Sequence, residues 1–188
     1  MKYVLKPAIM LFIFAAITTA ALALVYRVTY EPIQEQHRRL QERTRQEVLP
    51  KAASFTEPVV LSDSTSIRSV TEGLDGQGET IGYVIEISTP RGYAGDIDLM
   101  VGISAAENIV TGMRILKHSE TPGLGALAAR ERFYRLYDGR ALAPIRLVVR
   151  TSAVEGEIEA ITAATITTRA INDAVNEAIT WYAGGGFR

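Results

Sequence analysis

Thr162-Ala163-Ala164-Thr165-Ile166-Thr167-Thr168 is the stretch in which a loop gives way to the last helix of the chain. Behind it, apolar residues recur at a spacing of three and four, which is typical of a helix with one buried face: Ala170, Ile171, Ala174, Val175, Ala178, Ile179 and Tyr182. We therefore predict a helix that begins near Thr165. Thr162 and Thr165 both carry a hydroxyl group that accepts hydrogen bonds from first-turn amides, so either is a candidate N-cap.

The start of this helix is also a candidate anion site. Unpaired first-turn amides and the helix dipole attract phosphate groups, and here they stand beside threonine hydroxyls. From the spacing alone, an ordinary helix cap in a threonine-rich loop accounts for the same residues.

A second segment, His118-Ser119-Glu120-Thr121-Pro122-Gly123-Leu124-Gly125, directly follows a predicted strand. Its Pro-Gly turn and second glycine expose backbone amides and let the backbone approach a flat ligand. Taken alone, the segment also fits a plain connection between a strand and a helix.

Together the two segments resemble the FMN-binding-domain family. Glu159-Ala160-Ile161-Thr162-Ala163-Ala164-Thr165 resembles the flavinylation motif of that family, in which an acidic residue precedes Ser/Thr-Gly-Ala-Thr. His-x-Glu-Thr-Pro-Gly-Leu-Gly resembles its second hallmark, and two upstream segments resemble its Gly-Tyr-x-Gly and Val-Gly elements: residues 92–97 and 100–103. The chain departs from the family at Ala163, where the family has Gly, and at Glu159, where it usually has Asp.

The resemblance implies a covalent flavin. In the family, a separate flavin transferase joins FMN through its phosphate to the last threonine of the motif, and Thr165 is the matching residue, with Thr162 at the motif's first position. The resemblance further implies that the Glu-Thr-Pro-Gly-Leu-Gly loop lies against the isoalloxazine ring. The matching candidates for FMN binding are Glu120, Thr121, Gly123, Leu124 and Gly125. It assigns no catalytic nucleophile and no metal ligands.

Two further residues near these motifs have two interpretations each. His118 is a candidate for coupling a proton to flavin reduction, because histidine is a common proton carrier in proteins, but a structural histidine bonded to the loop is the preferred interpretation. Arg169 either balances a phosphate or is a solvated helix arginine.

Composition excludes several classes of protein. With no cysteine, the chain cannot form disulfides, thiolate-bound iron–sulfur clusters or c-type haem links, and its only histidines are His37 and His118. A net charge of −1 gives no basic field for nucleic acid. Redox chemistry in this chain would have to come from an organic cofactor.

Residues 7–26 form an uncharged apolar run that is long enough to cross a bilayer as a helix. A cleaved signal peptide is the competing interpretation, because Ala21-Leu22-Ala23 fits a cleavage site, but the run exceeds the usual apolar length of such peptides. We predict a membrane anchor over residues 1–27. Basic residues flank the run on both sides and do not orient it.

Residues 28–50 predict a helical stalk with one stripe of packing residues, in which His37 is half-buried: Tyr30, Ile33, His37, Leu40, Thr44 and Val48. The predicted strands that follow are residues 59–61, 67–71, 80–88, 97–103 and 109–117, then a short helix at 126–136 and a strand at 147–149. Strands grouped between helices predict an α+β fold. We therefore expect one N-terminal transmembrane helix followed by one antiparallel-sheet FMN-binding domain with flanking helices, over residues 51–188.

The family includes flavin subunits of Rnf-type ferredoxin:NAD oxidoreductases and of sodium-pumping NADH:quinone reductases, and the chain length favours the Rnf type. The resemblance implies an electron-transfer subunit of a membrane-bound, ion-translocating complex, with its soluble domain on the periplasmic side of a bacterial inner membrane. Its expected partners are other membrane and peripheral subunits, and a flavin transferase for maturation. The alternatives are an unmodified scaffold or sensor domain, a stand-alone enzyme with dissociable FMN, and the equivalent subunit of the quinone reductase.

Overall fold

The computed structural model describes residues 2–61, 66–149, 154 and 156–186. Both ends of the chain, Met1 and residues 187–188, lie outside the described residues, as do 62–65, 150–153 and 155 within the predicted domain. The chain divides into two compact units, residues 1–41 and residues 42–188, which are treated separately below.

Helix α1 runs from Lys2 to Val48 and contains both Pro7 and Pro32. It holds an 18-residue window of mean hydropathy 2.6, none of it buried, so it is long and apolar enough to cross a membrane. The predicted packing stripe along residues 30–48 is mostly wrong. His37 is exposed, as are Tyr30, Ile33 and Leu40, and only Thr44 and Val48 are buried. The reason is that only the last turns of the helix, from Glu42, belong to the folded unit.

The folded unit is built on an antiparallel sheet whose strand order is β1-β3-β4-β5-β6-β7, with β2 also paired to β3. The strands are β1 (Ser54–Phe55), β2 (Val59–Val60), β3 (Ile67–Leu74), β4 (Thr80–Thr89), β5 (Ile97–Ser104), β6 (Ile109–Lys117) and β7 (Arg140–Ala141). The five predicted strands correspond to β2 to β6. Consecutive hairpins through β6 carry the chain into the His118 loop.

Beyond that loop the predicted helix over residues 126–136 is wrong. The chain instead forms three short helices: a 3-10 helix η1 (Gly125–Ala129), an α-helix α2 (Glu131–Tyr134) and a 3-10 helix η2 (Arg135–Tyr137). Arg130 has extended backbone angles, φ −85° and ψ 148°, and so interrupts any continuous helix. The interruption buries Phe133 and Tyr137 and leaves Leu127 on the surface.

The late strand predicted at residues 147–149 is found as β8 (Arg146–Val148). It pairs in parallel with β9 (Glu157–Glu159), which we did not predict. The last helix, α3 (Thr165–Ala183), begins at the predicted residue.

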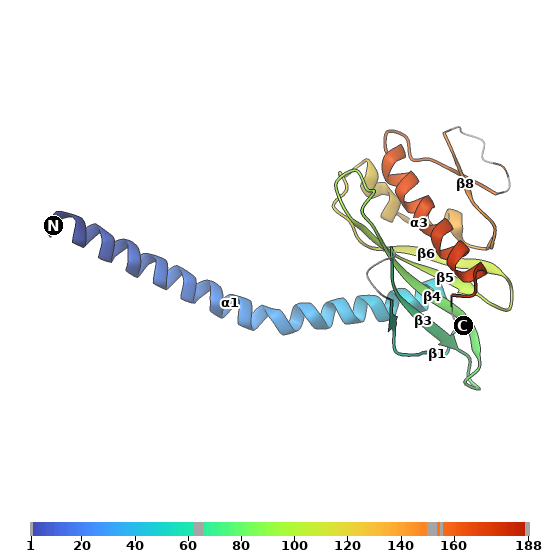
Figure 1. The fold of residues 1–188 in the computed structure, drawn as a ribbon, viewed down its shortest axis with the longest axis horizontal. Coiled ribbons are helices and arrows are strands. Elements are labelled where there is room, and N and C mark those ends of the chain that lie inside the picture. Colours follow the sequence, from blue (N-terminus) through green and yellow to red (C-terminus); the bar gives the residue numbers. More distant parts are fainter. Residues whose placement is uncertain (1, 62–65, 150–153, 155, 187–188) are drawn as a thin grey trace. The chain divides into compact units, whose positions relative to one another are not determined.

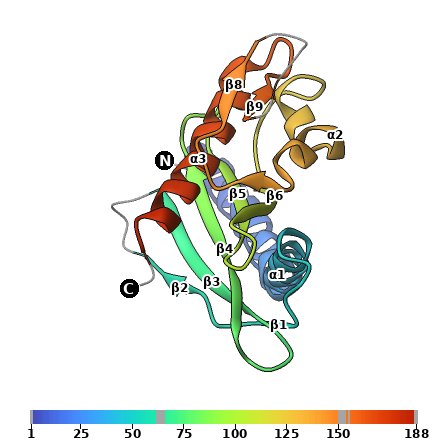
Figure 2. The ribbon, with the colours of Figure 1, turned by 90° about the vertical axis from the view of Figure 1, so that its right-hand side faces the viewer.

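One face of the sheet packs against α3, and Figures 1 and 2 show this helix crossing strands β4 and β5. The interface is the main hydrophobic core: Ile85, Ile87, Leu99 and Val101 of the sheet, with Ile171, Val175 and Ala178 of the helix. The predicted α+β fold class is confirmed.

The opposite face of the sheet receives the end of α1. A second core contains Val48, Leu49, Ala52, Val84 and Met100. Close approach is allowed by glycines on adjacent strands: Gly102 pairs with Gly112, and an added Cβ at Gly102 would collide with the carbonyl oxygen of Val48. The Thr111 hydroxyl donates a hydrogen bond to that same carbonyl oxygen.

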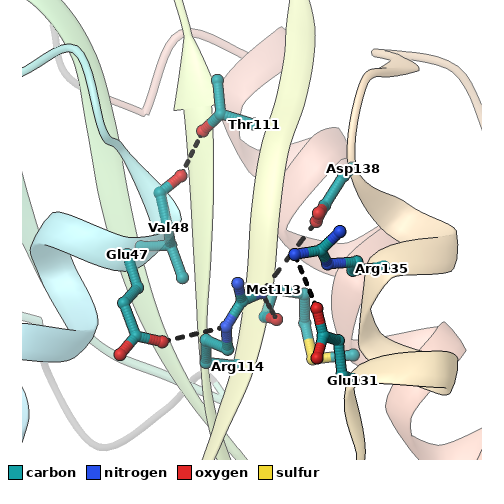
Figure 3. Close-up of polar contacts among 8 residues, drawn as sticks. All are labelled: Glu47, Val48, Thr111, Met113, Arg114, Glu131, Arg135 and Asp138. Atoms are coloured by element: carbon teal, nitrogen blue, oxygen red, sulfur yellow. Dashed lines mark hydrogen bonds and ion pairs between the residues drawn. The ribbon is translucent and has the colours of Figure 1, made fainter.

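Arg114 on β6 fixes this end of α1 at the side-chain level (Figure 3). Its Nε lies 3.1 Å from Glu47 Oε2 and its Nη1 lies 3.9 Å from Asp138 Oδ1. The guanidinium also stacks 3.8 Å above the Tyr134 ring. Strand β6, which ends at the His118 loop, is therefore held to the end of α1 and to the α2–η2 segment.

Candidate functional site

The first turn of α3 has no side-chain cap. Its N-cap residue is Ala164, whose side chain cannot accept a hydrogen bond. Among the described residues no other side chain accepts one from the free backbone amides of the first turn. The prediction that Thr162 or Thr165 caps the helix is therefore wrong. Thr162 is exposed in the preceding turn, and Thr165 is the first helical residue, partly exposed. A residue at that position lies past the cap and cannot take its role.

A different threonine shapes the turn before the helix. The buried Thr168 hydroxyl donates to Ala164 O at 2.8 Å and accepts from Ile161 N at 3.2 Å. The turn itself is closed by Ala164 N donating to Ile161 O at 2.9 Å. Thr168 thus holds the backbone of the motif while the first-turn amides stay open.

Ala163, the residue that stands where the family has glycine, has φ +61°. It is the third residue of the turn from Ile161 to Ala164, a position at which positive φ favours glycine. Alanine adopts the left-handed conformation at a cost, so the substitution keeps the shape of the turn and strains it.

Glu120 joins three segments of the chain. The residue is 6% exposed, and its Oε2 accepts a hydrogen bond from the Thr167 hydroxyl at 2.7 Å. Its Oε1 accepts from the backbone amide of Ala94 at 3.1 Å. The carboxylate therefore connects the loop at residues 92–95 and its own loop to the first turn of α3.

Two glycines make room for this carboxylate. A Cβ at Gly92 would lie 2.8 Å from Glu120 Oε1. A Cβ at Gly125 would collide with Glu120 Oε2 and lie 2.7 Å from Thr167 Oγ1. Gly92 belongs to the upstream segment at residues 92–97 and Gly125 to the segment at residues 118–125, both of which carry the family resemblance. Their lack of a side chain is what allows the close approach.

Three of the other four predicted loop residues are exposed. Thr121, Gly123 and Leu124 are exposed, whereas Gly125 is buried. The Thr121 carbonyl accepts from the amides of Leu124 and Ala126, at 3.1 and 3.2 Å, which closes the loop. Gly123 has φ +79°, as a turn of this kind requires.

The preferred interpretation of His118 as a structural residue is supported, because its Nδ1 accepts the backbone amide of Glu120 at 3.2 Å. Arg169 is exposed, one turn beyond Thr165. Its position on the surface fits a solvated arginine and leaves a role near a phosphate as a prediction.

Exposed apolar side chains occur on all three segments that Glu120 joins. Tyr93 is 70% exposed, Leu124 42% and Ile166 56%. Because these segments meet at Glu120, the three side chains are candidates for contact with an apolar ligand. A cavity of about 760 Å³ borders the 159–165 motif at Ile161 and Thr162. Its other lining residues include Leu127, Phe133, Arg130, Arg132 and Arg140.

These residues fit FMN. The open amides at the start of α3 suit its phosphate, and the partly exposed Thr165 is the first residue of the same turn. The exposed apolar side chains suit a flat aromatic ring. Sequence reasoning missed Ala94, Thr167 and Thr168. The two threonines carried a signal: they lie one helical turn before Ile171 and continue the buried stripe of α3.

Two family models match the chain. The model of the FMN-binding domain matches residues 92–180, which include both motifs. The model of the RnfG N-terminal region matches residues 1–48, the whole of α1.

Curated relatives match nearly end to end. The G subunit of the Na(+)-translocating ferredoxin:NAD(+) oxidoreductase complex of Acetobacterium woodii is 38% identical, covering 96% of this chain and 92% of that protein. The G subunit of the ion-translocating oxidoreductase complex of Methanosarcina acetivorans is 34% identical, covering 95% and 94%. Among solved structures, the C subunit of the Na(+)-translocating NADH-quinone reductase of Parabacteroides distasonis has the same fold, with a TM-score of 0.60 and 17% identity over 81% of this chain and 94% of that one.

Proposed function

The chain belongs to the family of G subunits of ion-translocating oxidoreductase complexes, and from this premise we propose that it is an electron-transfer subunit of an Rnf-type complex with FMN bound covalently at Thr165. The observation that carries the covalent part of this proposal is the start of α3. There a partly exposed threonine, Thr165, is the first helical residue, beside amides that no described side chain caps.

Attachment is a phosphoryl transfer onto this hydroxyl. The Thr165 Oγ1 forms a bond to the FMN phosphorus of a flavin dinucleotide supplied by a flavin transferase. The bond between that phosphorus and the bridging oxygen breaks, adenylate leaves, and the hydroxyl proton passes to a base of the transferase. The open amides of α3 stabilise the negative charge of the resulting phosphodiester.

The residues of the chain then have distinct roles in holding the cofactor. Thr165 and the first turn of α3 hold the phosphate, with Thr162 beside it. Thr121, Gly123 and Leu124 offer a polar group, open backbone and an apolar face to the ring. The bound flavin supplies the redox chemistry, and the protein fixes its place and tunes its potential.

Helix α1 anchors the protein in the membrane and docks it to other subunits of the complex. The span carries no charged side chain, so ion passage belongs to those partners. We place the soluble domain on the periplasmic side, as the family resemblance implies. The basic residues that flank the span do not forbid this orientation, because large C-terminal domains are translocated largely regardless of flanking charge.

The relationships favour this function over its alternatives. The G subunits match across the whole chain at 38% and 34% identity, whereas the quinone-reductase protein, at 17%, shares the fold. An unmodified scaffold would be favoured if Ala163 prevented the motif from forming its turn. Ala163 does adopt a positive φ in this turn, so its presence does not favour an unmodified scaffold.

The test is ferredoxin-dependent NAD reduction by membranes that contain the whole complex. Thr165→Val in this subunit should abolish the activity, because it removes the attachment oxygen, and Thr165→Ser, which keeps a hydroxyl, should retain it. Full activity in membranes carrying Thr165→Val would contradict the proposed relay. Turnover of soluble donors and acceptors by the isolated chain would favour a stand-alone enzyme instead.

A further inference from the structure

We propose that Glu120 is a positioning residue, which acts through Thr167 to hold the Thr165 hydroxyl in place for flavin attachment and does not itself bind the flavin. This inference rests on the proposed attachment of FMN to Thr165. It reassigns Glu120, which the family resemblance placed among the residues against the ring.

The carboxylate is directed into the protein. At 6% exposure, it offers almost no surface to a ligand, and both of its oxygens already accept hydrogen bonds. Thr167 is buried as well, at 1% exposure. A buried carboxylate with both oxygens engaged is a structural tie, since binding a ligand would first require these bonds to break.

The tie acts on the attachment residue through a short path. Thr167 lies two residues after Thr165 in the first turn of α3, so a constraint on its side chain helps to fix the rotation of that turn, together with the Thr168 bonds and the buried apolar face of the helix. The direction in which the Thr165 hydroxyl and the open amides face follows from this rotation.

The same carboxylate sets the loops around the hydroxyl. Ala94 donates to Oε1 from the 92–95 loop, and Gly92 and Gly125 approach too closely to allow any side chain. A second link between this region and α3 is the ion pair of Arg91 and Asp173, at 3.8 Å and with side chains 73% and 45% exposed. Exposed pairs of this kind contribute little, so of these two polar links the Glu120 carboxylate is the stronger.

Attachment is a transfer between two proteins and needs the hydroxyl, the amides and the incoming phosphorus in one geometry. Losing the bond between Thr167 and Glu120 would let the first turn of α3 rotate and the loops separate. The expected consequence is a slower transfer, by about tenfold, to a hydroxyl that is still present.

The experiment measures the rate of flavin attachment to the full-length chain in detergent, with purified transferase and flavin dinucleotide, by fluorescence of the protein band after denaturing electrophoresis. Thr167→Val should slow attachment about tenfold, and Thr167→Ser should restore the rate because it keeps the hydroxyl. Thr180→Val is the matched control, since Thr180 is on the same helix and its exposed hydroxyl donates to Asn176 O.

Glu120→Gln provides the second variant. Its amide oxygen can accept only one of the two hydrogen bonds, and its NH2 group can at most donate to the Thr167 hydroxyl. Two charge-assisted bonds are thus replaced by weaker neutral ones, so attachment should slow, and the double variant with Thr167→Val should be no slower than the slower single variant. Visible absorption of the attached flavin should change little in Glu120→Gln, because the side chain does not touch the ring. If Thr167→Val does not fold, Glu120→Gln makes the same test.

Attachment to Thr167→Val at the wild-type rate would overturn the inference. So would rate losses that multiply in the double variant, since the two residues would then act separately. A large change in the flavin spectrum of Glu120→Gln would contradict the inference, because it would indicate that Glu120 contacts the flavin ring. If the wild-type chain takes up no flavin, the proposed function fails and this inference fails with it.

Discussion

At position 163 an alanine occupies backbone space that favours glycine, and the energetic cost falls on the turn that presents Thr165. The left-handed conformation costs a non-glycine residue about 1–2 kcal/mol in the folded state. Glycine would remove this cost, but it would also raise the conformational entropy of the unfolded chain, which offsets part of the gain. We predict that Ala163→Gly stabilises the protein by about 1 kcal/mol, seen as a higher midpoint of urea unfolding.

Ala164→Gly is the control for this prediction. Ala164 is 7% exposed and has φ −135°, so glycine there gains no relief and loses a buried methyl group. It should destabilise the protein. Equal effects of the two substitutions would contradict the strain at position 163.

The buried hydroxyl of Tyr137 should make the stability of the protein depend on pH in the alkaline range. Complete burial raises the pKa of Tyr137 far above its usual value of 10.0. The unfolded chain therefore ionises this residue above about pH 10 while the folded chain does not, and stability is lost as pH rises, by about 1.4 kcal/mol per unit.

Tyr137→Phe removes this loss. Near neutral pH the wild type should be the more stable protein, by at most about 1 kcal/mol, because the Tyr137 hydroxyl lies a long 3.4 Å from Asn172 Oδ1. Above about pH 11 the order should reverse. Urea unfolding of both proteins from neutral to alkaline pH measures the difference, and parallel pH profiles would contradict the assignment.

Sequence reasoning predicted the start of α3 near Thr165 but not the contacts made by Glu120, Thr167 and Thr168 around it. The start of α3 could be predicted because the apolar periodicity behind it is local. The bond between Thr167 and Glu120 joins residues 47 positions apart, and only the packing of the loops against α3 brings them together. The N-cap was expected at Thr162 or Thr165 but is Ala164, because the Thr168 hydrogen bonds hold the preceding turn so that the helix starts directly after Ala164.

At the scale of elements, β3 to β6 could be predicted because alternation and turn residues mark each strand. The strand β6 was predicted at its observed bounds, residues 109–117. The division of residues 125–137 into three short helices could not be predicted, because the sequence around Arg130 does not indicate that its backbone is extended. The parallel pair of β8 and β9 joins strands brought together by the packing of α3, a contact that no local pattern announces.

The docking of α1 on the sheet gives a prediction at this scale. A methyl group at Gly102 would collide with the Val48 carbonyl oxygen, which lies in a packed core and is already bound by Thr111. Gly102→Ala should destabilise the folded unit by about 2–3 kcal/mol. Gly76→Ala, where the added Cβ meets nothing within 4 Å, should change stability little. Similar losses in both variants would indicate a general effect of removing glycine.

At the scale of the molecule, the folded unit begins within α1. Residues 42–188 form one compact unit, and Val48 and Leu49 are 0% and 1% exposed in it. We predict that a fragment of residues 42–188 folds without the membrane span. A fragment of residues 53–188 should be less stable by about 4 kcal/mol, because it lacks both side chains. Equal stability of the two fragments would support the domain boundary at residue 51 that the sequence predicted.

The central claim is that FMN is carried on Thr165, and one measurement addresses it directly. The full chain, Thr165→Val and the control Thr180→Val are each produced together with a flavin transferase and separated by denaturing electrophoresis. The account predicts flavin fluorescence in the bands of the wild type and of Thr180→Val, and a dark band for Thr165→Val. A fluorescent Thr165→Val band, or a dark wild-type band, would contradict it.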